Sequence, residues 1–279
     1  MSSAAILGAG SLGGTIAHKL ALGGRFREIR LIDASEAAAG KALDIQQSGA
    51  VDRFQARLAG TSDTLAAAGA SVIILADAVD AGEWEGDGGL ALVRQLVRAG
   101  TDAAFVFAGA RQLWLMEAAV RELGLAADRL IGTAASALVG AARALVGIEL
   151  DESSRDVQVT VAGRPPSFVV GWSSATVAGS LLTGRVPAHR LLAMGETLKR
   201  LWPPGPQAIA AATARAAEGL VFGSRQLQHA VTILDGEFGV RQVAAMLPLR
   251  LGHGRVLERI VPSLSPLERV GLVSGLSPV

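Results

Sequence analysis

The first half of the chain alternates short apolar runs with longer segments in which apolar residues recur at helical spacing. Four apolar runs bounded by turn residues are typical of buried parallel strands: Ala4–Leu7, Ile29–Ile32, Val72–Leu75 and Ala104–Phe107. The segments between and after them are predicted to be helices: Thr15–Leu22, Glu36–Gln47, Leu90–Arg98 and Leu113–Leu123. Such alternation predicts an α/β fold with a parallel sheet covered on both faces.

The second half of the chain has a different pattern, and we place a domain boundary near Gly132. Long helices are predicted at Ser136–Leu150 and Gln207–Leu220, and strands at Asp156–Val161 and Ser167–Val170. Two further segments are predicted to be connections: the proline-rich loop Leu201–Pro206 and the turn Asp235–Gly239, which separates two more strands. This mixture predicts an α+β domain after the parallel one.

Composition narrows the class of protein. The 279 residues carry 26 basic and 25 acidic side chains, and this balance leaves no basic surface for nucleic acid. Cysteine is absent, which excludes a disulfide scaffold, a cysteine nucleophile and a cysteine zinc site. The chain start has no signal-peptide pattern, and no run of 18 apolar residues occurs, so we expect a soluble, cytoplasmic protein without a membrane span.

One glycine-rich motif carries chemistry. The first apolar strand runs directly into Gly8-Ala9-Gly10-Ser11-Leu12-Gly13, and a helix follows. In this context the first glycine allows a tight turn, the second lets a pyrophosphate approach the backbone, and the third lets helix and strand pack closely. The phosphates would lie at the helix N-terminus. We therefore predict a dinucleotide site, in present use or inherited, formed by Gly8, Gly10, Ser11, Leu12 and Gly13.

The second strand ends on an acid at the offset that this motif requires. Asp33 follows Gly13 by 20 residues, where a carboxylate binds ribose hydroxyls and repels a 2′-phosphate. Asp33 therefore joins the predicted site, and NAD rather than NADP is the predicted cofactor. No histidine has the spacing of a metal site, and we predict no metal.

Several segments together resemble the malate/lactate dehydrogenase family, the NAD-dependent L-2-hydroxy-acid dehydrogenases. The resemblance covers almost the whole chain, and beyond the glycine turn it rests on the order of six segments: Gly40–Asp44, Gly60–Asp63, Trp172–Thr176, Leu234–Val240, Pro248–Gly252 and Leu264–Arg269. It implies a Rossmann domain at residues 1–132, a catalytic-type α+β domain at residues 133–279, and a homo-oligomer. It also implies hydride transfer between NAD(H) and a small-molecule substrate.

The chain departs from this family where the family carries its chemistry. There, a His donates a proton, an Asp orients that His, and an Arg binds the substrate carboxylate. By resemblance, Pro165 in the turn Gly163–Ser167 replaces the His, Leu138 replaces the Asp, and Ala141 replaces the Arg. Arg143 lies two residues after Ala141 and would point about 200° away on a helix.

Two more family features are missing. The segment 81–89, which resembles the mobile loop of the family, has three acids and no arginine, and the chain contains no asparagine for the position after the fifth strand. Where the family has a small Ala-Gly after the fourth strand, this chain has Ala76-Asp77. A carboxylate at Asp77 would repel a pyrophosphate if it faced one. The direction of that side chain is left open by the sequence.

These observations leave three functions open. The first is a pseudoenzyme that binds NAD but does not act on 2-hydroxy acids, and serves a regulatory, scaffolding or partner-binding role. The second is an active NAD-dependent oxidoreductase for a neutral or cationic substrate, with Arg164 as the nearest electrophile. The third is a structural or partner-binding protein that has lost the cofactor, for which Asp77 is the warning sign. The catalytic residues and the substrate are unknown at this stage.

Overall fold

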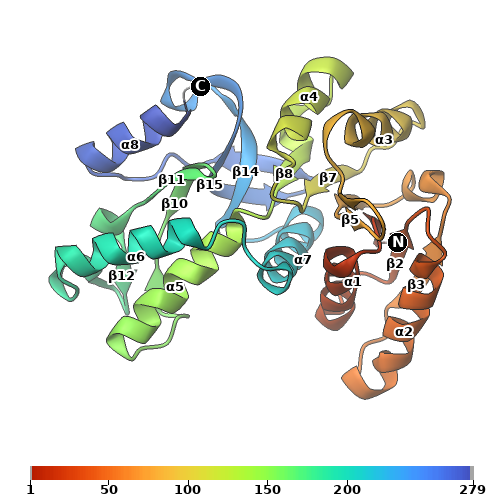
Figure 1. Cartoon of the computed structure of the whole chain (residues 1–279), viewed down its shortest axis with the longest axis horizontal. Helices are drawn as coiled ribbons and strands as arrows, with labels where there is room; N and C mark the ends of the chain where they lie inside the picture. Colours follow the sequence, from red (N-terminus) through yellow and green to blue (C-terminus); the bar gives the residue numbers. More distant parts are fainter. Residues whose placement is uncertain (1, 277–279) are drawn as a thin grey trace.

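The computed structural model describes residues 2–276, and its centre is an 11-stranded sheet (Figure 1). The first half of the chain supplies strands that pair in parallel in the order β3-β2-β1-β4-β7-β8. Their bounds are β1 (Ser3–Leu7), β2 (Glu28–Ile32), β3 (Arg57–Thr61), β4 (Val72–Leu75), β7 (Ala104–Phe107) and β8 (Leu130–Gly132). Strand order reverses between β1 and β4, the position where open parallel sheets bind ligands.

Helices cover both faces of the parallel strands because alternate side chains point to opposite faces. Ala4 and Ile6 of β1 belong to a buried cluster with α1 (Ser11–Gly23), α2 (Ala37–Asp52) and α7 (Pro206–Phe222). Ala5 and Leu7 belong to a second cluster with α3 (Gly86–Arg98) and α4 (Leu113–Leu123). Figure 1 shows these two groups of helices on either side of the sheet. The predicted doubly wound α/β fold is confirmed.

The second half of the chain extends the same sheet with antiparallel strands. β14 pairs with β8 through Val231 and Gly132, and β15, β10 and β11 follow in that order, with β16 paired to β15. Their bounds are β10 (Val161–Arg164), β11 (Ser167–Val170), β14 (Gln228–Asp235), β15 (Arg241–Gly252) and β16 (Arg255–Arg259). Pairing thus changes from parallel to antiparallel at the boundary predicted near Gly132. The division into two domains stays a prediction.

The remaining helices and one group of short strands belong to this antiparallel half, and one short hairpin belongs to the parallel half. The helices are α5 (Ser136–Leu150), α6 (Ala188–Arg200) and α8 (Pro266–Leu276), and a small separate sheet contains β9 (Val157–Gln158), β12 (Thr176–Val177) and β13 (Ser180–Leu181). A two-stranded hairpin, β5 (Asp77–Ala78) with β6 (Gly82–Glu83), follows β4. No helix within residues 2–276 is long and apolar enough to cross a membrane.

Most predicted elements are confirmed, and two of the differences have a clear physical reason here. The predicted strand Asp156–Val161 is wrong in extent, because the chain changes sheets there: β9 pairs with β12, whereas β10 pairs with β11 and β15. β3 was not predicted as a strand, because it forms one edge of the sheet and alternates exposed and buried positions around Leu58 without a continuous apolar run.

Candidate functional site

The glycine turn has the geometry that its sequence predicts. Gly8 adopts a positive φ of 109°, and a Cβ built there would lie 2.3 Å from the carbonyl oxygen of Asp77. A Cβ on Gly13 would lie 2.0 Å from the carbonyl oxygen of Gly8. Gly10 directly precedes α1. The glycines therefore serve a tight turn and a close approach of β1, β4 and the first turn of α1.

Asp33 lies beside this turn, as its spacing indicated. Its side chain is buried at 5% exposure and accepts three backbone N–H bonds. Oδ2 accepts from Ala9 N at 2.8 Å and from Val79 N at 3.0 Å, and Oδ1 accepts from Ser35 N at 3.0 Å. The structure thus brings the predicted cofactor-binding residues together. Their binding of a cofactor stays a prediction.

Asp77 also faces the glycine turn, which settles the direction that the sequence left open. Its Oδ2 accepts a hydrogen bond from Leu12 N at 3.0 Å, and its Oδ1 accepts one from Gly13 N at 2.7 Å. These N–H groups belong to the first turn of α1, where helix donors lack intrahelical partners and attract anions. A pyrophosphate at this helix terminus would need the same donors. The residues as arranged therefore do not fit a dinucleotide phosphate.

The β5–β6 hairpin that carries Asp77 is held against the edge of the sheet from both ends. Trp84 follows the hairpin, and its indole N–H donates to the carbonyl oxygen of Leu7 at 3.0 Å. The side-chain amide of Gln112 donates to the carbonyl oxygen of Trp84 at 3.0 Å. Glu83 Oε2 accepts from Arg111 N at 2.9 Å. The segment that resembles the family's mobile loop thus lies across the carboxyl ends of the strands.

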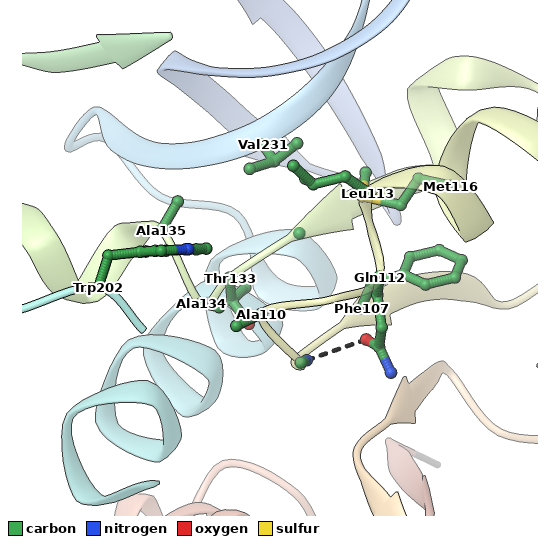
Figure 2. A pocket seen from close by; sticks show the side chains of 12 residues that line it. Phe107, Ala110, Gln112, Leu113, Met116, Thr133, Ala134, Ala135, Trp202 and Val231 are labelled. Carbon is green, nitrogen blue, oxygen red and sulfur yellow. Dashed lines mark hydrogen bonds between the residues drawn. The ribbon is translucent and has the colours of Figure 1, made fainter. Parts of the chain in front are cut away.

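A small pocket lies at the carboxyl ends of β7 and β8 (Figure 2). Its free volume is about 10 Å³, which is room for roughly one water. The lining is Phe107, Gly109, Ala110, Gln112, Leu113, Met116, Gly132, Thr133, Ala134, Ala135, Trp202 and Val231. Figure 2 shows Trp202 beside Ala135 at one end of this group, with Phe107 and Gln112 at the other.

The polar side chains of this pocket already have partners. Gln112 Oε1 accepts from Gly109 N at 2.9 Å, the bond drawn in Figure 2. The hydroxyl groups of Thr133 and Thr213 lie 2.6 Å apart and share a hydrogen bond. The lining contains neither histidine nor arginine. It therefore offers no proton donor of that kind and no guanidinium for a carboxylate.

A wider cleft opens next to this pocket. Its volume is about 410 Å³, and it is lined by Ala81, Gly82, Glu83, Glu85, Ala110, Arg111, Trp202 and Pro203. Arg111 Nη1 lies 3.6 Å from Glu85 Oε1, and both side chains are largely exposed. The charged groups of the cleft are therefore mainly paired with one another, and Glu83 and Glu85 give it an acidic wall.

The four histidines lie away from the pocket and the cleft. His18 Nε2 lies 2.9 Å from Asp52 Oδ2, and His189 and His253 are exposed. His229 on β14 is mostly buried; burial first, and then the charge of Arg143, lowers its pKa to about 4. All four histidines fall within residues 2–276, and none lines the pocket or the cleft.

Two arginines lie near the positions at which the resembled family binds its substrate. Both side chains are engaged by other groups of the chain. Arg143 donates from Nε to the carbonyl oxygen of Ser154 and from Nη2 to that of Arg155, each at 2.9 Å. The guanidinium of Arg164 pairs with Glu117 on α4, and Glu117 also accepts from Ala244 N at 2.8 Å. For the described part of the chain, no three metal-ligating side chains form a cluster.

Comparisons with known proteins match this fold along nearly the whole chain. The malate dehydrogenase of Thermomicrobium roseum is 29% identical over 286 residues, which cover 96% of this chain and 92% of that relative. The solved malate dehydrogenase of Salinibacter ruber superposes with a TM-score of 0.86 at 25% identity, covering 98% of this chain and 93% of the other. Along nearly its whole length the chain is similar to malate and lactate dehydrogenases, from which it has diverged to below 30% identity in these comparisons. No protein-family model matches it.

A further family structure is the lactate dehydrogenase of Cryptosporidium parvum in complex with lactic acid and nicotinamide adenine dinucleotide. Its TM-score is 0.87 at 19% identity, with 98% of this chain and 94% of that chain covered, and at this identity the likeness shows the fold alone. The family fold is thus present in full.

Proposed function

We propose that this family member does not oxidise 2-hydroxy acids or reduce 2-oxo acids and serves a non-catalytic, partner-binding role. The observation that carries the proposal is the lining of the pocket at the carboxyl ends of β7 and β8 and of the cleft beside it. Small-molecule sites enclose several hundred cubic ångströms, roughly 300 or more. This pocket leaves about 10 Å³ beside Trp202. The adjoining cleft of about 410 Å³ is large enough for a ligand, but it has an acidic wall of Glu83 and Glu85 and no histidine in its lining to donate a proton.

The side chains that replace the family's catalytic groups support the same proposal. Hydride transfer to a carbonyl needs a proton donor and a group that orients the substrate. By resemblance these positions hold Pro165, Leu138 and Ala141, and Leu138 is fully buried in the core of α5. Arg143 is on the same helix, but its donors are spent on backbone carbonyl groups of the following loop. These three side chains can supply neither a proton donor nor a guanidinium for a carboxylate.

The alternative of an active oxidoreductase with a neutral or cationic substrate gains little from the geometry. It needs Arg164 as an electrophile, yet that guanidinium is paired with Glu117 and also donates to the carbonyl oxygen of Ala244 at 3.2 Å. It needs free acids to attract a cation, yet Glu83 accepts a backbone N–H and Glu85 lies near Arg111. We therefore do not adopt it.

NAD(H) remains the cofactor that the glycine turn, Asp33 and the malate dehydrogenase relatives indicate for the ancestral site. A homo-oligomer is proposed from the same resemblance. Both proposals concern what the fold inherited. Neither requires that this chain still carries out the reaction.

A turnover assay tests the proposed function. The purified chain is mixed with NADH and, in separate reactions, oxaloacetate, pyruvate, and panels of ketones and imines, and loss of NADH absorbance is followed. We expect no loss above the rate in heat-denatured protein, while the Salinibacter ruber enzyme turns over oxaloacetate as a positive control. Reduction of oxaloacetate or pyruvate by the chain would contradict the proposal, and so would reduction of any other substrate.

A further inference from the structure

Asp77 lies at the topological switch point of the sheet, directly opposite the glycine turn. β4 ends at Leu75, and Ala76 N donates to the carbonyl oxygen of Leu7 at 2.9 Å. Gly10 N then donates to the carbonyl oxygen of Asp77 at 2.8 Å. The backbone on both sides is therefore fixed, and it directs the Asp77 side chain toward the first turn of α1.

The Asp77 carboxylate makes contacts that a phosphate makes at such a helix end. Each of its two oxygens accepts one N–H of the first turn, from Leu12 at 3.0 Å and from Gly13 at 2.7 Å. A negative charge there also interacts favourably with the helix dipole. The chain thus satisfies the free donors of α1 with its own anion, and needs no bound ligand to do so.

The space above Gly10 is filled by the same carboxylate. A Cβ on Gly10 would lie 2.3 Å from Asp77 Oδ2 and 2.4 Å from its Cγ. In a dinucleotide-binding turn the second glycine keeps this space open for the pyrophosphate. Here the missing side chain makes room for Asp77, which explains why a glycine is needed at this position without any cofactor.

The ribose-binding acid is drawn into the same arrangement. Val79, two residues beyond Asp77 on the hairpin, donates its N–H to Asp33 Oδ2 at 3.0 Å. Asp33 is thereby linked to the hairpin as well as to the glycine turn through Ala9 N. Together with the bond from Trp84 to Leu7, this holds the hairpin closed by contacts internal to the chain.

We propose that Asp77 is a built-in replacement for the dinucleotide pyrophosphate, so that the glycine turn of this chain no longer binds NAD(H). At close range the negative charge of Asp77 repels a diphosphate. The carboxylate also occupies the N–H donors and the volume that the diphosphate would need. This inference goes beyond the loss of hydride-transfer chemistry and does not depend on it. A dehydrogenase homologue can lose its acid–base groups and still bind NADH, whereas Asp77 acts on binding itself.

The test compares nucleotide binding by the wild type, Asp77→Asn and Asp77→Gly. NADH is titrated with its fluorescence as the readout, and ADP, which carries the diphosphate without nicotinamide, is titrated by calorimetry. The wild type is expected to show no saturation up to millimolar nucleotide. Asp77→Gly, which removes both charge and volume, is expected to bind at least about tenfold more tightly. Asp77→Asn removes the charge alone and should fall between them.

Asp80→Asn is the matched control, because Asp80 lies exposed on the same hairpin and makes no hydrogen bond or ion pair with the glycine turn. It should bind nucleotide no better than the wild type. Thermal unfolding and circular dichroism verify that each variant folds. If Asp77→Gly does not fold, the comparison of nucleotide binding by the wild type and by Asp77→Asn still tests the inference. A wild-type dissociation constant in the micromolar range overturns the inference, and so does equal binding by the wild type and Asp77→Asn.

The outcomes also separate this inference from the proposed function. Saturable NADH binding by the wild type without turnover contradicts the role of Asp77 and leaves the loss of chemistry intact. Turnover of a hydroxy or keto acid by Asp77→Gly, with none by the wild type, contradicts the proposed loss of catalytic groups and supports the role of Asp77.

Discussion

Two aspartates beside the glycine turn differ in how far their positions follow from local sequence. Asp33 is placed by its offset from Gly13, and the bond from Ala9 N to its carboxylate confirms that the two segments meet. Asp77 comes from a strand 64 residues beyond Gly13, and its direction depends on the hairpin that follows. A repulsive role for Asp77 was foreseeable from its charge. Its occupation of the helix donors was not, because side-chain direction depends on tertiary contacts.

A prediction at the residue scale concerns His229. Protonation of its imidazole at acidic pH should destabilise the folded chain. Burial first, and then Arg143, lowers its pKa from 6.5 to about 4, and its Nε2 has no hydrogen-bond partner among the described residues. The unfolded state binds a proton below about pH 6.5, whereas the folded state does so only near pH 4. The free energy of unfolding should therefore fall as the pH falls through this window, by on the order of 3 kcal/mol.

The measurement is urea unfolding of the wild type, His229→Leu and His189→Ala at several pH values in this window. His229→Leu removes the titrating group, so its unfolding free energy should depend less steeply on pH. His189 is exposed, and His189→Ala should keep the wild-type dependence. Parallel pH profiles for the wild type and His229→Leu would show that His229 is not the cause.

At the scale of single elements, helix boundaries show where local preference gives way to tertiary contact. The sequence predicted a first helix from Thr15, because Gly13 and Gly14 are poor helix formers. α1 nevertheless begins at Ser11. Asp77 provides the acceptors that the N–H groups of Leu12 and Gly13 need, so the helix can include both glycines. The missing information was a contact with a distant segment.

α8 shows the opposite case, because its start follows from a local motif. Ser265-Pro266-Leu267-Glu268 forms a capping box: Ser265 N donates to Glu268 Oε2 at 2.8 Å, and Glu268 N donates to Ser265 Oγ at 3.4 Å. Glu268 also accepts from Ser173 N at 3.0 Å, which ties α8 to the segment after β11.

Ser265→Ala is therefore expected to lower the free energy of unfolding by about 1 kcal/mol. Urea denaturation measures this change. Ser263→Ala serves as a control, because Ser263 is exposed two residues earlier, and it should change stability by less than about 0.5 kcal/mol. Equal losses in the two variants would argue against a capping role for Ser265.

At the scale of the whole molecule, a single sheet joins the two halves of the chain. The outer face of α2 carries apolar side chains that are exposed. Leu43 and Val51 lie two turns apart on this helix and are 58% and 81% exposed. Apolar side chains so placed favour burial in an interface. We therefore expect the proposed homo-oligomer to use this face of α2.

The double variant Leu43→Glu with Val51→Glu should shift the chain toward monomer in size-exclusion chromatography with light scattering. Ile148→Glu is the matched control: Ile148 is 80% exposed on α5, and its substitution should leave the assembly unchanged. A wild type that is monomeric at every concentration would contradict the proposed oligomer. Dissociation by Ile148→Glu alone would move the interface to α5.

Local patterning was sufficient for the strand and helix alternation, the glycine turn and the nearness of Asp33, because each depends on short spacings and on side-chain periodicity along one element. Long-range packing decided the rest. Trp202 lines the pocket from a loop about 70 residues beyond β8, and Asp77 reaches α1 from the far side of the switch point. Glu117 engages Arg164 across two domains of the predicted division. These contacts join residues that are distant in the chain, so only the folded arrangement determines which side chains meet and what space remains for a ligand.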